Sequence, residues 1–454
     1  MGFTTDSPLI IGPEDIARLQ GNVDELLGEA KRQGASACEV AAQRRLRHQA
    51  STAGAGGHTE RIEASLGLAV YRGQQRGEVH VDLLDGAYSP AEAVRSALRL
   101  AAAAEADPFA GLAEPDSLAF EYPALNLYFD TPIDSQALLA HVRTCEAAGL
   151  AADRRILDSR GTSLSVEHGC RVHGNSHGFL GSYAWTEHAL NCYLRASAND
   201  ERRSGGVQDV QRQFGELLPF ADAGQTAARR AISYLGGQAV PAGATAVVFA
   251  PEAAQWLLAG FMQAITGKHL HQQRSFLFGR LDQQLFRQGI GIEENPLMPS
   301  GLGSLPFDAE GVRVDSRLFV DDGWLVSYAL DAESARRLGL PNTGNAVANP
   351  FEIARNLSFV PGDSSQADLL RQMDSGVLVV EARPPQLDLR TGDFTQRAIG
   401  FQVRGGAVGA VLAPLTLSGN LADVFSRVLA TGNDQPVSGR TRTGSVWVEQ
   451  ITIA

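Results

Sequence analysis

The sequence predicts an α+β protein whose N-terminal part combines antiparallel strands with flanking helices, followed by a C-terminal β-rich antiparallel domain with a buried helix. Two successive groups of elements predict the first part: a helix, three strands and a helix, and then a helix, a strand hairpin and a helix. A change in composition predicts the second part, because glycine is frequent after 236–243 and the predicted strands become short. We therefore divide the chain into segments 1–110, 111–235 and 236–454, with the middle segment packed against the first.

Length and charge limit the classes of function. A chain of 454 residues with 44% hydrophobic and 20% charged residues can bury a large core, as soluble globular proteins do. The 39 Lys and Arg residues against 51 Asp and Glu residues give a net charge of −12. Nucleic-acid binding requires clustered cations, so this balance argues against a nucleic-acid partner.

Cysteine usage and hydropathy indicate the compartment. Cys38, Cys145, Cys170 and Cys192 are scattered without a C-x-x-C pair, which is typical of free thiols in a reducing environment. The first residues have neither a cationic region nor a long apolar run, and no apolar stretch of 18 residues occurs. We expect a cytoplasmic protein without a membrane span.

In the first segment, residues 1–13 read as a loose arm, and apolar residues at helical spacing predict a helix over Glu14–Gln33 that ends at Gly34. A glycine-rich stretch at 51–57 predicts a mobile loop and lacks the pattern of a phosphate-binding loop. Ser89 with Pro90 and Glu92 predicts the start of a helix that runs to about Glu105. The predicted strands are Ala37–Arg47, Ile62–Tyr71 and Gly77–Leu84.

The middle segment begins with an extended connector at 107–133, which holds four prolines and no clear period. A helix over Asp134–Ala152 then leads to a hairpin of two long strands, Thr162–His173 and Gly178–Ala198. Turn residues at 174–178 join the two strands. A helix over 207–235 is predicted to close this segment.

The last segment holds short strands and short helices that alternate along the chain. Asp322-Gly323 predicts a tight turn between the first two strands, and Gly339 is a helix stop. The predicted strands are Arg313–Val320, Trp324–Leu330, Gly376–Ala382, Ala398–Arg404, Ala407–Leu415 and Ser445–Ile453, and the predicted helices are Asp331–Leu338, Ser365–Met373 and Leu421–Leu429.

The stretch from Val247 to Leu277 is central to the functional argument. A short buried strand over Val247–Ala250 is expected to continue into a helix from Pro251 to Ile265, in which Pro251 and Glu252 suit the first turn. One face of this helix is apolar at helical spacing. The residues of that face are Ala254, Leu257, Leu258, Phe261, Met262 and Ile265.

This stretch resembles the TldD/PmbA family, also called modulators of DNA gyrase. Short runs in a shared order carry the resemblance over most of the chain. They are 174–178 (GNSHG), 275–277 (SFL), 306–313 (PFDAEGVR), 334–340 (SARRLGL) with 343–344 (TG), 391–394 (TGDF), 418–421 (SGNL) and 431–434 (TGND). This sequence differs from the family's pattern at 48–62, where the glycine cluster is expected to replace the family's strand–turn–strand.

The resemblance implies that the catalytic branch, TldD, carries His-Glu-x-x-x-His on this helix and a further Cys ligand near the C-terminus. The matching positions here hold Ala259, Gly260, Ala264 and Thr431. Zinc requires lone pairs from imidazole, thiolate or carboxylate, and a general base must accept a proton. Alanine and glycine side chains do neither, so the chain resembles the PmbA/TldE branch, without a catalytic residue or a metal ligand at these positions.

The resemblance further implies a partnership. A TldE-like chain pairs with a TldD-like metallopeptidase chain that holds the zinc, and the pair cleaves unfolded or extended peptides in peptide maturation and antitoxin turnover. We expect peptides to add as strands along a sheet edge. Two alternatives remain open, a stand-alone peptidase with a relocated metal site and a homodimeric peptide-binding module formed by the isolated chain.

Several other residues suggest chemistry. His269 and His271 are the candidate ligands of a relocated zinc site, and His173 with His177 has helical metal spacing within a predicted hairpin. Asn175, His177, Asp308 and Arg313 are candidate contacts to the cavity or the peptide. Asp308, Glu310 and Arg313 read either as an acid/base set or as a loop-bracing network, and Tyr183, Trp185 and Tyr193 read as ligand-stacking or packing residues.

Overall fold

The computed structural model describes residues 11–54, 56–84, 88–131, 134–240, 242–348, 353–436 and 439–454. The arm predicted over 1–13 therefore lies mostly outside the described residues. The helix that follows it, α1 (Pro13–Arg32), begins with Pro13 in its first turn and ends before Gly34, which has a positive φ of 84°. The sequence prediction for this helix is confirmed to within one residue at each end.

The N-terminal half is built on a six-stranded antiparallel sheet in the order β3-β2-β1-β4-β5-β6. Its members come from both of the first two predicted segments. The central pair, β1 and β4, joins residues more than a hundred positions apart, such as Arg45 and Gly169. The strands are β1 (Ala37–Ser51), β2 (Gly57–Arg72), β3 (Gln75–Asp82), β4 (Ile156–Asn175), β5 (Leu180–Ala198) and β6 (Glu201–Gln211).

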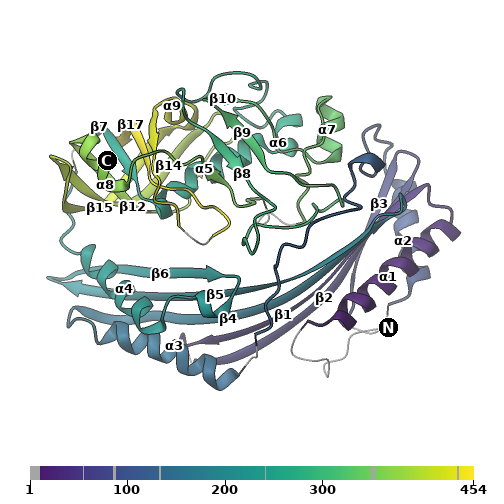
Figure 1. The fold of residues 1–454 in the computed structure, drawn as a ribbon, viewed down its shortest axis with the longest axis horizontal. Helices are drawn as coiled ribbons and strands as arrows, with labels where there is room; N and C mark the ends of the chain where they lie inside the picture. Colours follow the sequence, from purple (N-terminus) through teal and green to yellow (C-terminus); the bar gives the residue numbers. More distant parts are fainter. Residues whose placement is uncertain are drawn as a thin grey trace.

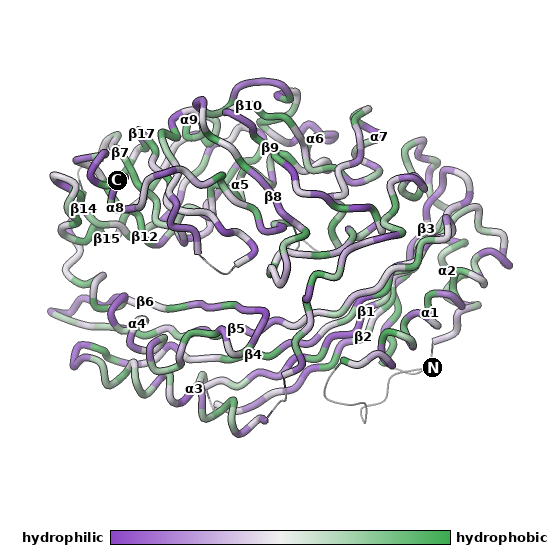
Figure 2. Tube along the Cα trace, viewed as in Figure 1, coloured by the Kyte–Doolittle hydropathy of each residue, from purple (hydrophilic) through white to green (hydrophobic). Residues whose placement is uncertain are grey.

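Helices cover the face of this sheet that turns away from the C-terminal half (Figure 1). Helices α1 and α2 (Pro90–Ala103) pack on β1 and β2, and α3 (Ser135–Leu150) and α4 (Phe220–Ser233) pack on β4 and β5. Successive strand residues point to opposite faces, so even-numbered residues such as Val40, Cys170 and Leu190 lie under the helices. The tube accordingly changes between hydrophilic and hydrophobic colours along these strands (Figure 2).

The predicted helix over 207–235 is wrong in its first part. Residues 201–211 form strand β6, a short 3-10 turn η2 (Phe214–Glu216) follows, and the helix begins only at Phe220. Asn199 and Asp200 both have positive φ angles, 50° and 63°, and turn the chain back so that β6 pairs with β5. The pairing with β5 supplies the main-chain partners that a helix would have supplied locally.

The expected departure at 48–62 is also wrong, because the strand–turn–strand is present. Strand β1 continues to Ser51, which pairs with Gly57 at the start of β2. The connecting residue Thr52 exchanges main-chain and side-chain hydrogen bonds with Thr162 at 2.9 and 3.0 Å. Strands β1 and β2 are therefore paired up to Ser51 and Gly57, and Thr52 docks on β4.

The connector from Asp107 crosses from the N-terminal half to the C-terminal half, with one 3-10 turn, η1 (Pro115–Ser117). Pro132 and Ile133 of the predicted connector lie outside the described residues. Phe179 and Phe307 meet where the two halves touch, with ring centroids 5.2 Å apart. Their apolar cluster also includes Leu118 of the connector and Val312.

The C-terminal half contains a seven-stranded sheet whose pairings close on themselves. Strand β12 pairs with β7, then come β17, β15 and β14, and β14 pairs again with β12. Closure leaves these five strands without a free edge. The strands are β7 (Gly243–Phe249), β12 (Gly376–Ala382), β13 (Gln386–Leu387), β14 (Asp393–Arg404), β15 (Ala407–Asn420), β16 (Val428–Thr431) and β17 (Val446–Ile453).

The expectation of an antiparallel C-terminal half needs one correction, since β7 and β12 run parallel. A second, four-stranded sheet is antiparallel and has the order β10-β9-β8-β11. The remaining elements are β8 (Ile292–Glu294), β9 (Arg317–Asp321), β10 (Trp324–Leu325), β11 (Ser358–Phe359), α6 (Gly267–His271), α7 (Ala332–Leu338), α8 (Gln366–Met373) and α9 (Leu421–Ser426).

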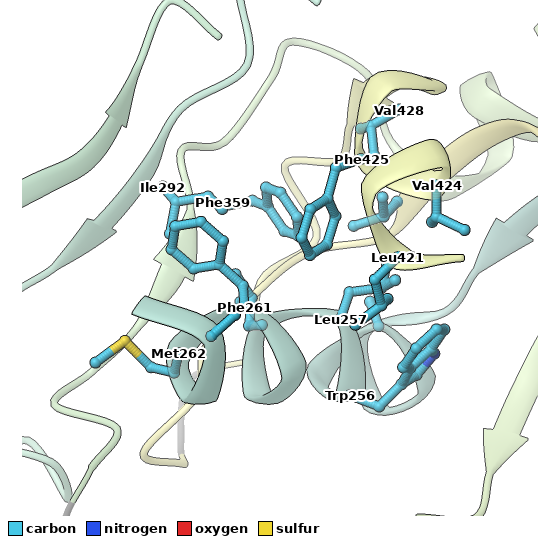
Figure 3. Close-up of a cluster of buried hydrophobic side chains, with 14 of the residues drawn as sticks. Trp256, Leu257, Phe261, Met262, Ile292, Phe359, Leu421, Val424, Phe425 and Val428 are labelled. Atoms are coloured by element: carbon cyan, nitrogen blue, oxygen red, sulfur yellow. The ribbon is translucent and has the colours of Figure 1, made fainter. Parts of the chain in front are cut away.

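Helix α5 (Pro251–Ile265) has the bounds that the sequence predicted. Leu257 and Phe261 point from it toward Leu421 and Phe425 of α9, within a cluster of apolar side chains (Figure 3). Phe261 and Phe425 have ring centroids 5.9 Å apart. The helix is thus buried in the core of the C-terminal half, as predicted. Across the residues that the structure describes, no helix is both long and apolar enough to span a membrane.

Buried histidines make the stability of the N-terminal half depend on pH. Burial lowers the pKa of His168 to about 4, and its Nδ1 lies 3.1 Å from the Tyr128 hydroxyl. An unfolded histidine titrates near about 6.5, so between these values the unfolded chain binds a proton that the folded chain does not. The contribution of His168 to stability is therefore fully present above about pH 6.5 and is lost as the pH falls toward about 4.

We predict that His168→Gln reduces the acid destabilisation, because glutamine keeps the polar contact but cannot be protonated. The loss of unfolding free energy between about pH 7 and pH 5, measured by urea denaturation, should shrink by roughly 2 kcal/mol. The groups around His168 that shift its titration are Asp130, His48 and Glu167. An unchanged pH dependence in the variant would show that another group dominates.

Candidate functional site

The four positions matched to the family's metal site differ in their surroundings. Ala259 lies on the exposed side of α5, whereas Gly260 and Ala264 are buried. A Cβ atom at Gly260 would lie 2.8 Å from Leu421 Cδ1, so the backbone of α5 and helix α9 are in close contact there. The hydroxyl of Thr431, at the end of β16, donates to the Val360 carbonyl at 2.8 Å. Gly260 and Ala264 therefore belong to packed surroundings and Thr431 makes a local hydrogen bond, whereas Ala259 is exposed.

The candidate ligands of a relocated site lie on α6. His269 and His271 are half-buried, and burial, together with Lys268 and Arg274, lowers the pKa of His269. Within the described ranges, no group of three or more His, Cys, Asp or Glu side chains is placed to hold a metal ion. His173 and His177 also fail to pair as ligands, because His173 belongs to β4 and the Nδ1 of His177, in the turn, lies 3.1 Å from the Ala113 carbonyl.

Asp308, Glu310 and Arg313 do not form an acid/base set. The carboxylate of Asp308 accepts hydrogen bonds from the backbone N–H groups of Glu310, Val312 and Ala346 at 2.8 to 3.0 Å. Arg313 is exposed and its nearest carboxylate is that of Asp315, at 4.0 Å. The loop-bracing alternative is the one that the structure supports.

Burial dominates the electrostatics of this loop. It raises the pKa of Asp308 to about 6, against the opposing effects of the Arg355 guanidinium and the three backbone donors. Burial and the neighbouring Asp308 charge hold the pKa of Glu310 well above its usual range, and its Oε2 accepts from the Ala332 N–H at 2.9 Å. The Oδ1 of Asn175 accepts from the His177 N–H at 3.0 Å in the β4–β5 turn, and its buried Nδ2 has no hydrogen-bond partner among the described residues, so its contact with a peptide stays a prediction.

A cavity of about 620 Å³ lies elsewhere, between the six-stranded sheet and the C-terminal half. Odd-numbered residues of β1, β4 and β5 form its floor, because the even-numbered residues face the helices. Register places them in rows across the three strands. The rows are Gln43–Arg171–Tyr183, Arg45–Gly169–Trp185 and Arg47–Glu167–Glu187. We call this cavity the arginine chamber.

Gly169 shapes the centre of the floor. A Cβ atom at this position would lie within 3.0 Å of three atoms of the Trp185 indole, a distance that real Cβ atoms do not show. The indole therefore lies across the backbone of β4. The Arg45 guanidinium lies over the same ring at 5.6 Å from its centroid, a cation–π contact. The floor thus offers an aromatic face and a cation side by side.

Ion pairs hold two other arginines of the chamber. Arg47 donates to Glu167 Oε2 through both Nε and Nη2, at 2.9 and 2.6 Å. Arg440 enters from the C-terminal half and donates to Glu187 at 2.6 Å and to the Leu302 carbonyl at 2.7 Å. Arg440 therefore connects the two halves across the chamber.

Arg212, which follows β6, makes a second connection. Its guanidinium donates to the carbonyls of Thr186, Gly301 and Leu302 at 2.9 to 3.0 Å, and the residue is only 4% exposed. Burial lowers the pKa of Arg212 to about 10, so it stays charged at neutral pH. Sequence reasoning missed these arginines. The signal available was the alternation of polar and charged residues at 43, 45 and 47, which predicts one face of a strand.

Comparison with known proteins identifies the relatives of this fold. The PmbA/TldA metallopeptidase central domain matches residues 130–235 and the C-terminal domain of that family matches residues 242–454. The chain is 32% identical to metalloprotease PmbA of Escherichia coli O157:H7, over 88% of each protein, and 32% identical to a PmbA homolog of Haemophilus influenzae, over 86% of each.

Two crystal structures share the fold. A candidate modulator of DNA gyrase from Bacteroides thetaiotaomicron superposes with a TM-score of 0.89 at 22% identity, over 98% of this chain and 100% of that one. TldE from Thermococcus kodakarensis superposes with a TM-score of 0.78 at 17% identity, over 95% of this chain and 100% of that one. At these identities the structural likeness establishes the fold.

Proposed function

We propose, from the premise that this chain belongs to the PmbA/TldD metallopeptidase family, that it is the non-catalytic subunit of a two-chain zinc metallopeptidase. One observation carries the proposal: the positions matched to the family's metal site hold Ala259, Gly260, Ala264 and Thr431. Methyl groups and a hydrogen provide no lone pairs for zinc, and the Thr431 hydroxyl already donates to a carbonyl. The zinc that the family implies does not fit these residues.

The packing of α5 supports the same proposal. A glutamate at Gly260 would have to displace Leu421 of α9, since even a Cβ atom there lies 2.8 Å from that side chain. The helix has kept its apolar contacts to the core, as the Leu257 and Phe261 contacts show (Figure 3). In this proposal, the zinc and the general base belong to a TldD-like partner chain, and this chain shapes the space in which the peptide lies.

Extended peptides are the substrates we propose, because strand addition to a sheet edge uses main-chain hydrogen bonds and excludes folded chains. The six-stranded sheet has its edges at β3 and β6. Such cleavage would serve peptide maturation or the turnover of labile antitoxins in the cytoplasm. This role requires no catalytic atom from the present chain.

The test is co-expression with a TldD-like relative that carries the His-Glu-x-x-x-His motif. We expect one co-eluting complex on size exclusion, hydrolysis of an unfolded peptide by the complex, and none by either chain alone. The double variant His269→Ala/His271→Ala should leave the activity of the complex unchanged. A lone chain that hydrolyses the peptide and loses this activity in the double variant would support a relocated site. A stable homodimer that binds peptide and ignores the relative would support a binding module.

A further inference from the structure

We propose that Cys145 and Cys192 form an oxidisable pair, whose disulfide fastens helix α3 to strand β5 when a peroxide is present as the oxidant. All four cysteines of the chain are free and buried, but these two lie side by side. The pair lies under the helices on the sheet face that turns away from the C-terminal half (Figure 1). The inference is therefore independent of the proposed function.

Packing between α3 and β5 places the two residues opposite each other. A Cβ atom at Gly149 would lie 2.5 Å from Leu194 Cδ1, so the helix and the strand touch there. Helix α3 turns back into β4, which is antiparallel to β5, so α3 and β5 run in the same direction. Cys145 precedes Gly149 by about 6 Å along the helix axis. Cys192 precedes Leu194 by about 6.7 Å along the strand, so the two cysteines coincide.

Hydrogen bonds join the same two places independently. Glu146, which follows Cys145, accepts from the Thr52 hydroxyl at 2.7 Å. The same hydroxyl oxygen accepts from the N–H of Thr162 at 3.0 Å. Thr162 is the register partner of Cys192, and its own hydroxyl donates to the Cys192 Sγ at 3.4 Å. The thiols of Cys145 and Cys192 are also hydrogen-bonded to each other, so the two sulfur atoms are already in contact.

This contact assigns a role to each sulfur. The hydrogen bond between the thiols lowers the pKa of Cys192, whereas the same bond and burial raise the pKa of Cys145. The Cys192 thiolate therefore attacks one oxygen of hydrogen peroxide and becomes a sulfenic acid, and the other oxygen leaves as hydroxide and is protonated to water. The Cys145 sulfur then attacks the sulfenic sulfur, gives up its proton and displaces a second water. The two thiols lose two electrons and two protons in total.

The other two cysteines provide a matched control within the same chain. Cys38 and Cys170 are equally buried and belong to one apolar cluster. Register places Cys170 opposite Arg44, six residues along β1 from Cys38, which corresponds to about 20 Å. A disulfide spans at most about 7 Å between Cα atoms. Burial alone therefore does not make a pair, and Cys38 and Cys170 should remain thiols.

The experiment exposes the reduced full chain to hydrogen peroxide, alkylates the remaining thiols after unfolding, and maps the peptides by mass spectrometry. We expect two of the four thiols to disappear and one crosslink, Cys145–Cys192, which dithiothreitol cleaves. The reaction should be slow, because peroxide reaches the buried pair only when α3 opens locally. The oxidised protein should unfold several degrees higher than the reduced protein, since the disulfide constrains the unfolded chain.

Cys192→Ala should abolish the crosslink, and Cys38→Ala should leave it unchanged. Circular dichroism of both variants establishes that they fold, and the peptide map of the unsubstituted chain decides the question even if a variant does not. The inference is overturned if all four thiols persist, if a crosslink includes Cys38 or Cys170, or if Cys192 is oxidised to a sulfinic acid without a crosslink. An oxidised protein that unfolds at the temperature of the reduced one would overturn the fastening of α3 to β5.

Discussion

Gly224→Ala should strongly destabilise the N-terminal half, by roughly 3 kcal/mol, because helices α3 and α4 touch through their backbones at this residue. A Cβ atom at Gly224 would lie within 3.0 Å of the carbonyl group of Cys145 and of the Gly149 nitrogen. These atoms belong to the backbone of α3, so they cannot rotate away as a side chain can. Helix α4 would have to move and open the apolar cluster beneath it, which includes Val142 and Ala227.

Gly21→Ala is the matched control for this prediction. Gly21 is an exposed residue inside α1, and a Cβ atom there meets nothing within 4 Å. Alanine at this position should stabilise the protein by up to about 1 kcal/mol through helix propensity. Thermal and urea unfolding of both variants should therefore show shifts of opposite sign. A Gly224→Ala protein as stable as the Gly21→Ala protein would mean that α3 and α4 are further apart than described.

Arg212→Ala should loosen the contact between the two halves and lower stability by roughly 2–4 kcal/mol. The buried guanidinium satisfies the carbonyls of Thr186, Gly301 and Leu302, and removal of the side chain leaves these acceptors without their donor. The planar fork of arginine reaches carbonyls on both halves at once, so Arg212→Lys should restore the charge but only part of the stability.

Arg440→Ala provides the comparison. It removes the contacts to Glu187 and Leu302, but its side chain is 37% exposed, so water can replace part of what is lost and we expect about 1 kcal/mol. Thermal unfolding, together with the susceptibility of the segment near 301–302 to a protease, measures both effects. If Arg212→Ala and Arg440→Ala lowered stability equally, the claim that burial makes the Arg212 hydrogen bonds more important would be contradicted.

Local signals in the sequence predicted much of the fold. Pro251 and the apolar spacing that follows defined α5 to the residue, and Gly339, with its left-handed φ of 65°, ended α7 where predicted. Strand β6 was not predicted because its residues 205–206 are glycines, which carry no strand signal. Its extended conformation is stabilised by pairing with β5. The same cause explains why the parallel pair of β7 and β12 was not predicted, since these strands are more than a hundred residues apart.

The candidate site residues stay predictions. Asp308 and Asn175 were chosen for their chemistry, and the structure adds that Asp308 braces its loop and Ala346, whereas the buried Nδ2 of Asn175 has no hydrogen-bond partner among the described residues. The arginine chamber depends on the register of three strands, which brings Arg45 opposite Gly169 and Gly169 opposite Trp185. A single sequence carries the alternation of each strand but not the register between them.

The central claim is that this chain contributes no metal site to the peptidase, and zinc analysis tests it most directly. Plasma mass spectrometry of chelator-free preparations should give about one zinc per complex with the TldD-like chain and none per lone chain, given the residues at 259, 260, 264 and 431. One zinc per lone chain, lost in the His269→Ala/His271→Ala variant, would contradict the account.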